Sequence, residues 1–185
     1  MKPLYFMMQY LLNPRTVGAI TPSSKYLANM MIERLDLKKA KYIVEYGSGT
    51  GVFTDKLIKK KNGQTILLLI ESNEKFCNIL KEKYKDETNV LIVNGNVEYI
   101  DKYLLEYGIP YVDYVISGLP FATLPMTVSE TILGLTKTIL GKEGRFITFQ
   151  YSQCRRKFIS RFFEEIEVKR EYRNLPPAYV FHCKN

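Results

Sequence analysis

Short apolar runs alternate with amphipathic segments along most of this chain. The runs are rich in Ile, Val, Leu, Tyr and Phe, and such runs are typical of strands buried on both faces of a sheet. They predict five strands, at residues 41–46, 65–70, 90–93, 112–117 and 145–151. Two further strands are expected on either side of a proline-containing turn at residues 174–177.

The segments between the strands carry apolar residues three and four positions apart, which predicts helices. The expected helices cover residues 24–36, 51–61, 74–84, 97–107, 127–140 and 155–163. Thr127-Val128-Ser129-Glu130 fits a capping box at the start of the fifth helix, and Gly141 is expected to end that helix.

Strands that alternate with helices predict an α/β fold with a seven-stranded, mostly parallel sheet and helices on both faces. The last two strands are joined without a helix, so the last strand is expected to run antiparallel. With 185 residues and no visible linker, the chain is expected to form a single domain, 1–185. A helical extension is expected over residues 1–37 and the α/β core over 38–185.

Composition limits the cellular compartment, the metal sites and the partners that can be expected. No apolar run reaches the roughly 18 residues of a membrane-spanning helix, and the apolar stretch at residues 4–12 lacks the cleavage site of a signal peptide. The three cysteines are far apart and odd in number, which argues against a disulfide framework and a zinc site. We therefore expect a cytoplasmic protein without a metal. The net charge of +8 fits an anionic partner, either nucleic acid or a membrane surface, or simply a solvated basic surface.

A glycine-rich loop follows the first predicted strand. Glycines in such a loop permit a tight turn and let the backbone approach a ligand closely. A dinucleotide-binding fingerprint would need a further glycine at position 52, which is Val52 here. The loop residues expected to bind a cofactor are Gly47, Ser48, Gly49 and Gly51.

The G-x-G-x-G spacing, preceded by Glu45, resembles the first motif of class I methyltransferases, which have a Rossmann-like fold. This resemblance implies S-adenosylmethionine as the cofactor, with its amino-acid end wrapped by the loop and oriented by Glu45. Glu71 ends the second strand, where a carboxylate can accept hydrogen bonds from ribose hydroxyls. Asn96 and Val97 follow the third strand, where the family binds adenine. Ser117 ends the fourth strand and is also expected to contact the cofactor, at the start of the loop where the family binds the acceptor.

Three segments resemble bacterial phospholipid N-methyltransferases, which methylate the amine of phosphatidylethanolamine. They are residues 13–24, 117–121 and 174–178. Thr21, in the first segment, is expected to contact the cofactor. The resemblance implies a phospholipid amine as the acceptor. Phe121, in the loop after the fourth strand, and Tyr151, at the end of the fifth, are expected to position it, because aromatic rings can hold a methylated ammonium. No residue stands out as a catalytic base, because the single histidine, His182, lies near the chain end.

The ribosomal RNA adenine dimethyltransferases are the alternative, together with enzymes acting on small-molecule amines. In the RNA enzymes an asparagine of the fourth-strand loop binds the flipped-out adenine, and Gly118 stands at that position here. The chain also ends soon after the last strand, so no helical RNA-binding domain is expected. A peripheral position on the inner membrane surface is expected instead, with residues 1–15 and the basic residues Arg155, Arg156 and Lys157 docking on anionic lipid.

Overall fold

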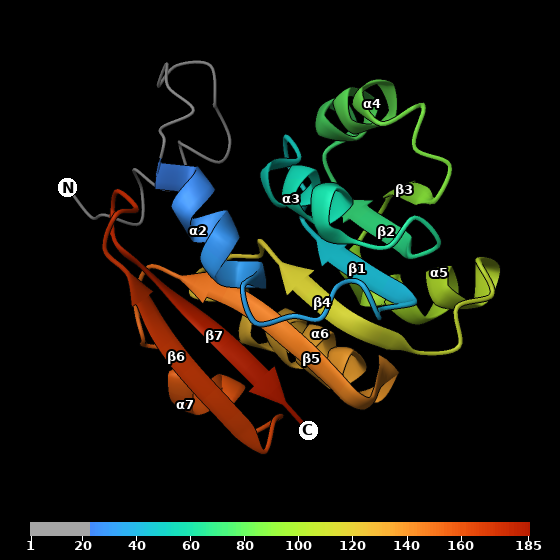
Figure 1. Cartoon of the computed structure of the whole chain (residues 1–185). Helices are drawn as coiled ribbons and strands as arrows, with labels where there is room; N and C mark the ends of the chain where they lie inside the picture. The colour runs from blue at the N-terminus through green and yellow to red at the C-terminus, as the bar shows by residue number, and fades with distance from the viewer. Residues whose placement is uncertain (1–22) are drawn as a thin grey trace.

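A computed structural model describes residues 23–185, and these form a single twisted sheet with helices on both faces (Figure 1). All seven predicted strands are present. The strands are β1 (Tyr42–Tyr46), β2 (Ile66–Glu71), β3 (Val90–Asn94), β4 (Val112–Ser117), β5 (Leu140–Gln150), β6 (Glu165–Glu171) and β7 (Ala178–Lys184).

The strand order is β3-β2-β1-β4-β5-β7-β6. Strands β1 to β5 are mutually parallel, whereas β7 runs antiparallel to both of its neighbours, β5 and β6. The Rossmann-like fold with an antiparallel last strand is thereby confirmed. The order reverses between β1 and β4, so the loops after these two strands diverge at one edge of the sheet. We call this the carboxyl edge, because the parallel strands end there.

Two layers of helices cover the sheet. One face packs against α2 (Ser23–Ile32), α3 (Val52–Lys60) and α4 (Glu74–Lys83), and the other against the 3-10 turn η1 (Val97–Tyr99), α5 (Ile100–Glu106), α6 (Met126–Ile139) and α7 (Arg156–Ile159). The central strands are buried on both sides, which explains their continuous apolar sequences. β2 shows this most clearly, with Leu67 and Leu69 in one core and Leu68 and Ile70 in the other.

Helix α2 belongs to the segment predicted as an extension, and it packs directly on the sheet. Its buried side chains Leu27, Met31 and Ile32 join the same core as Leu57 of α3 and Val180 of β7. The apolar stretch at residues 4–12, the expected cofactor residue Thr21 and the rest of residues 1–22 lie outside the described part of the chain.

Three local predictions differ from the structure. Helix α6 begins at Met126 behind Pro125 and has no side-chain cap, so the capping box at Thr127 is not formed. Gly141 lies inside β5, because the helix has already ended at Ile139. The helix expected over 155–163 is shortened to the four residues of α7, since the chain turns at Ser160.

The cysteines, the helix lengths and the acidic and metal-binding side chains of residues 23–185 bear on the predictions made from composition. Cys77 and Cys183 are buried, Cys154 is exposed in the loop after β5, and all three are free. No helix among residues 23–185 is long and apolar enough to cross a membrane. Within the same residues, no group of three or more His, Cys, Asp or Glu side chains could hold a metal ion.

Candidate cofactor and acceptor site

The glycine loop lies at the point where the strand order reverses. It leaves the end of β1 and leads into α3, with β2 on one side of β1 and β4 on the other. The Gly47 amide donates to the Ile70 carbonyl at 2.8 Å, and the Gly118 amide donates to the Tyr46 carbonyl at 2.8 Å. The loop after β1 is therefore fastened to both neighbouring strand ends, at the place where α/β sheets bind their ligands.

The glycines of this loop have different surroundings. A Cβ atom at Gly51 would lie 2.2 Å from the Tyr84 hydroxyl, which itself donates to the Gly51 carbonyl, so the absence of a side chain there serves packing against α4. Gly49 also has a positive φ, of 54°, yet nothing lies within 4 Å of its Cβ position. The space above Gly49 is thus open to a ligand.

Glu45 lies beneath the loop and is fully buried. One carboxylate oxygen accepts from the Thr54 hydroxyl at 2.8 Å, and the other, Oε1, has no partner within the described chain. Burial raises the pKa of Glu45 to about 8, chiefly because desolvation penalises the ionised form. The buried Ser48 hydroxyl likewise has no partner there. Two orphaned polar groups beside an open glycine loop fit the cationic, hydrogen-bonding amino-acid end of S-adenosylmethionine.

Glu71 closes the other side of the loop. Its carboxylate accepts from the Gly49 amide and from the Asn73 amide, both at 2.8 Å. A carboxylate has about four acceptor positions, so two remain for other donors. Glu71 therefore orients the glycine loop and retains the capacity to accept from ribose hydroxyls.

A cavity of about 170 Å³ adjoins the loop between the ends of β2 and β3 and helix α6. It brings together Gly47, Asn96 and Val97 from the predicted set. The Asn96 side chain accepts from the Glu98 amide at 3.3 Å and donates to the Glu98 carboxylate at 2.7 Å, which caps η1. Sequence reasoning missed the apolar wall that α6 and the loop before it supply. The further lining residues are Ile70, Ser72, Gly95, Glu98, Leu119, Leu124, Val128 and Ile132.

The loop after β4 is the expected acceptor loop. The buried Ser117 hydroxyl accepts from the Leu119 amide at 3.2 Å and so shapes the turn rather than lining the cavity. A Cβ atom at Gly118 would lie 2.9 Å from the Gly47 carbonyl oxygen. Because that neighbour is backbone, the two loops can meet only if position 118 is glycine.

Gln150 was not predicted, and it holds the same loop from the end of β5. Its buried side chain donates to the Leu119 carbonyl at 3.0 Å and accepts from the Ala122 amide at 3.2 Å. A glutamine at the end of the apolar run 145–151 was the available signal, because a buried amide must find partners. Gln150 is a positioning residue for the acceptor loop.

The two residues expected to position the acceptor differ in their surroundings. The Phe121 ring is fully buried and packs edge-on against Phe146, with ring centroids 6.1 Å apart. Phe121 thus lies in the core beneath the loop after β4, and its expected part in positioning the acceptor stays a prediction. Tyr151 is half-buried at the carboxyl edge and packs edge-on against Phe149, with centroids 5.6 Å apart.

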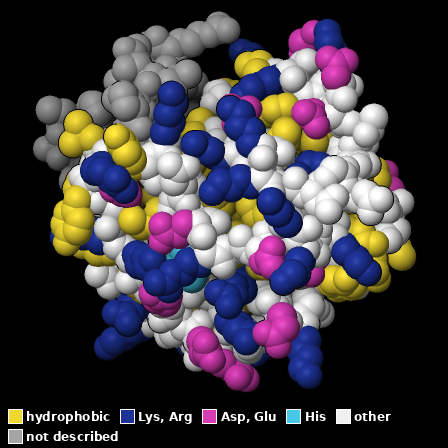
Figure 2. All heavy atoms as spheres, viewed as in Figure 1, with side chains coloured by type: hydrophobic (Ala, Val, Ile, Leu, Met, Phe, Trp, Pro, Cys, Tyr) yellow, Lys and Arg dark blue, Asp and Glu magenta, His cyan; other side chains and the backbone are white. Residues whose placement is uncertain are grey.

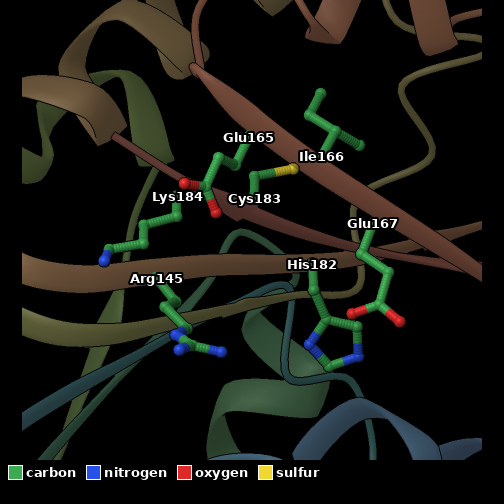
Figure 3. Close-up of a pocket in the computed structure, with 7 residues that line it drawn as sticks. All are labelled: Arg145, Glu165, Ile166, Glu167, His182, Cys183 and Lys184. Carbon is green, nitrogen blue, oxygen red and sulfur yellow. The ribbon is translucent and has the colours of Figure 1, made fainter.

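A larger cavity, of about 410 Å³, lies far from these loops. It is lined by residues of β5, β6 and β7 where these strands begin to pair. His182 points into it, with Arg145 and Glu167 nearby (Figure 3). Both ring nitrogens of the buried His182 lack a partner within the described chain. The only histidine of the protein is therefore remote from the glycine loop and takes no part in that site.

Comparison with known proteins agrees with this geometry. Residues 23–158 match the family model described as ribosomal RNA adenine dimethylase. An ornithine lipid N-methyltransferase from Singulisphaera acidiphila is 28% identical over 97% of this chain and 94% of its own length. A ribosomal RNA small subunit methyltransferase A from Borreliella afzelii is 33% identical, but over 55% of this chain and 34% of its own length.

Solved structures share the fold at low sequence identity. The N-methyltransferase NodS from Bradyrhizobium japonicum, in complex with S-adenosyl-L-homocysteine, superimposes with a TM-score of 0.71 and 14% identity over 98% of this chain and 97% of NodS. A precorrin-6y C5,15-methyltransferase from Geobacter metallireducens gives 0.67 and 15% identity over 86% and 88%. The chain therefore belongs to the ribosomal RNA adenine dimethylase family and is an S-adenosylmethionine-dependent methyltransferase of the Rossmann-like class.

Proposed function

We propose that this protein methylates the amino group of a membrane lipid, either phosphatidylethanolamine or an amino-acid lipid of the ornithine type. The observation that carries the proposal is the likeness to the ornithine lipid N-methyltransferase, which extends over nearly the full length of both chains. The likeness to the ribosomal RNA enzyme extends over only about a third of that enzyme.

The acceptor loop supports a lipid amine over an adenine base. The RNA enzymes are expected to bind the adenine amine with an asparagine at the position of Gly118. That side chain cannot be accommodated here without moving the Gly47 backbone, whose carbonyl oxygen lies 2.9 Å from the Cβ position. A flexible alkylamine has no planar base for an asparagine to bind, and the surrounding loop can align it.

The residues of the chain then have separate tasks. Glu45, Ser48 and the backbone at Gly49 would hold the amino-acid end of the cofactor, Glu71 its ribose, and Asn96 with Val97 its adenine. Bound S-adenosylmethionine supplies a methyl group already activated by its sulfonium. Tyr151 and the loop fastened by Gln150 would align the lipid amine with that methyl group and exclude water.

The amine must be neutral to react, and a free alkylamine has a pKa near 10. The only histidine lies in the distant cavity, and the buried Glu45 is assigned to the amino-acid end of the cofactor. We therefore assign the loss of the proton to water. Tyr151→Ala should lower turnover while leaving the affinity for S-adenosylmethionine unchanged. Tyr151→Phe should restore most of the turnover, because the ring and not the hydroxyl would stabilise the positive charge that forms on the nitrogen as the methyl group is transferred.

The setting that fits this function is the cytoplasmic face of the membrane. The basic residues Arg155, Arg156 and Lys157 follow β5 at the carboxyl edge and would face anionic headgroups. The apolar stretch within residues 1–15 would add to this contact.

Methyl transfer from radiolabelled S-adenosylmethionine tests the proposal. The acceptors are vesicles containing phosphatidylethanolamine, vesicles containing an ornithine lipid, deproteinised small-subunit ribosomal RNA, and free ethanolamine. The proposal expects label in at least one lipid and at most a trace in RNA. Label in RNA alone would establish the ribosomal RNA alternative, which the family match favours. Label in ethanolamine alone would establish a small-molecule acceptor.

A further inference from the structure

The turn between β6 and β7, residues 172–177, presents large apolar side chains to solvent at the carboxyl edge. Tyr172 is 70% exposed and Leu175 is 81% exposed. The turn lies at this edge because Tyr179 pairs with Gln150, the last residue of β5, while Glu171 pairs with Ala178. In Figure 2, hydrophobic side chains gather at the left margin, over the region where Figure 1 shows this turn.

The exposure belongs to an ordered turn. The Glu171 carboxylate is buried and accepts three hydrogen bonds from Arg173, from the backbone amide at 2.9 Å and from the guanidinium at 2.8 and 2.7 Å. The buried Asn174 side chain donates to the Pro176 carbonyl at 2.8 Å. Leu175 is thus held outward by the polar residues that flank it and cannot simply fold back onto the core.

Arginines lie beside the aromatic side chains at this edge. The Arg170 guanidinium lies 4.8 Å from the ring centroid of Tyr172, and that of Arg173 lies 4.2 Å from the ring centroid of the half-exposed Tyr26. The exposed Met126 lies at the same edge of the sheet, and its sulfur accepts a contact from Arg155 at 3.4 Å. Apolar tips with cations beside them match an anionic lipid surface, whose phosphates meet the arginines while its acyl boundary receives the apolar groups.

Other partners fit this surface less well. Stacking on a nucleic-acid base needs free aromatic faces, whereas Leu175, the more exposed of the two side chains, has no ring, and Arg170 covers one face of Tyr172. A stable protein interface buries about 800 Å² on each side, whereas two protruding side chains on one turn offer a small, convex contact.

We propose that residues 170–175 form a membrane anchor, in which Leu175 and Tyr172 enter the headgroup–acyl boundary of an anionic bilayer while Arg170 binds phosphate and Arg173, paired with Glu171, holds the turn in shape. The anchor holds the carboxyl edge, with the acceptor loop and the cofactor cavity, against the membrane. Lipid amines then reach the site from the bilayer surface without leaving it. This inference rests on the proposed function, since a lipid acceptor gives the anchor its purpose.

The test compares two leucines of equal exposure. Leu175→Glu alters the anchor, and Leu105→Glu alters the last turn of α5, at the opposite edge of the sheet, where Leu105 is 83% exposed. Flotation of the full chain with vesicles of phosphatidylglycerol and phosphatidylcholine should show about a tenfold weaker partition for Leu175→Glu, because an apolar contact is replaced by a charge that anionic lipid repels. Leu105→Glu should partition like the unaltered protein.

Calorimetric affinity for S-adenosylmethionine, unchanged in both variants, shows that the fold is retained. If the two variants partition equally, the anchor is overturned, whether both bind vesicles like the unaltered protein or both bind them more weakly. A second arm measures methylation of the lipid acceptor in vesicles and in detergent micelles. Leu175→Glu should lose turnover on vesicles and keep it in micelles; full turnover on vesicles overturns the anchor. If the unaltered protein methylates no lipid in either form, the proposed function fails, while the flotation result still decides whether the anchor exists.

Discussion

At the scale of single residues, the three glycines of the cofactor loop share a conformation and differ in their surroundings. Gly51 is required by Tyr84, whose hydroxyl occupies the space of a side chain, whereas Gly49 borders open space. The motif letters alone cannot make this distinction, because the contact with Tyr84 depends on how α4 packs beside the loop.

Gly49→Val should weaken S-adenosylmethionine binding at least tenfold, because its side chain would enter the space open to the ligand. Gly108→Val is the matched control: Gly108 also has a positive φ, of 64°, with nothing within 4 Å of its Cβ position, but it lies in the loop before β4. Both variants should lose about 1–2 kcal/mol of stability through backbone strain. Calorimetric titration that finds equal affinities in the two variants would contradict the assignment of Gly49.

Glu45 makes cofactor binding depend on pH. Its pKa is raised to about 8, so the cofactor-free protein carries a protonated Glu45 at neutral pH. The cofactor's ammonium group favours the ionised form, and binding below pH 8 must then release a proton. Affinity for S-adenosylmethionine should rise between about pH 6 and pH 8 and level off above. The same shift lowers the stability of the cofactor-free protein as pH rises from 4.5 toward 8.

The check is calorimetric titration at several pH values in two buffers of different ionisation enthalpy, which counts the protons released. Glu45→Gln should abolish both the proton release and the rise with pH. Proton release that persists in this variant would assign the effect to another group.

At the scale of elements, the strands were predicted well because burial on both faces leaves a continuous apolar sequence, as in β2. Helix ends were predicted less well. The start of α6 is fixed by Pro125 and not by the hydroxyl of Thr127, and the basic segment after β5 yields only one turn of helix. The meeting of Gly47 with Gly118, and the place of Gln150, depend on which loops the sheet brings together, and no local pattern records that.

Gln150 joins β5 to the acceptor loop, and its two hydrogen bonds to that loop can be separated. Gln150→Glu keeps an acceptor for the Ala122 amide and loses the donor to the Leu119 carbonyl. Turnover should fall about tenfold or more while the cofactor affinity changes little, because misplacement of a positioning loop acts on the alignment of the acceptor. Initial rates at saturating S-adenosylmethionine, with calorimetry for the cofactor, check this. Equal losses of turnover and affinity would show that Gln150 supports the whole site.

At the scale of the whole molecule, the sheet keeps two kinds of chemistry apart. The cofactor loop, acceptor loop and exposed turn lie at the carboxyl edge, whereas the cavity around His182 lies at β7, three strands across the sheet from β1. Burial lowers the pKa of His182 below its usual 6.5. Among the charged neighbours, Glu167 and Glu33 raise this pKa, whereas Lys169 and Arg34 lower it further. This pKa shift makes the stability of the fold depend on pH, and the cofactor and acceptor site takes no part in it.

Because the folded protein binds fewer protons at His182 than the unfolded chain does, stability should fall as pH drops below 6.5 and stop falling below the folded pKa. Urea unfolding between pH 5 and pH 8 should show this slope, and His182→Gln should flatten it. NMR reports the folded pKa directly, since the chain has a single histidine. A folded pKa above 6.5 would contradict the prediction.

The position of the exposed cysteine makes the carboxyl edge directly observable. Cys154 lies in the loop between β5 and α7, and the other two thiols are buried. A thiol-reactive fluorophore would therefore attach at one place without any substitution, close to Arg155 and Tyr151. An environment-sensitive dye there would report in real time, by a blue shift and a rise in intensity, whether this edge meets lipid, and rapid mixing would give the rates of arrival and departure.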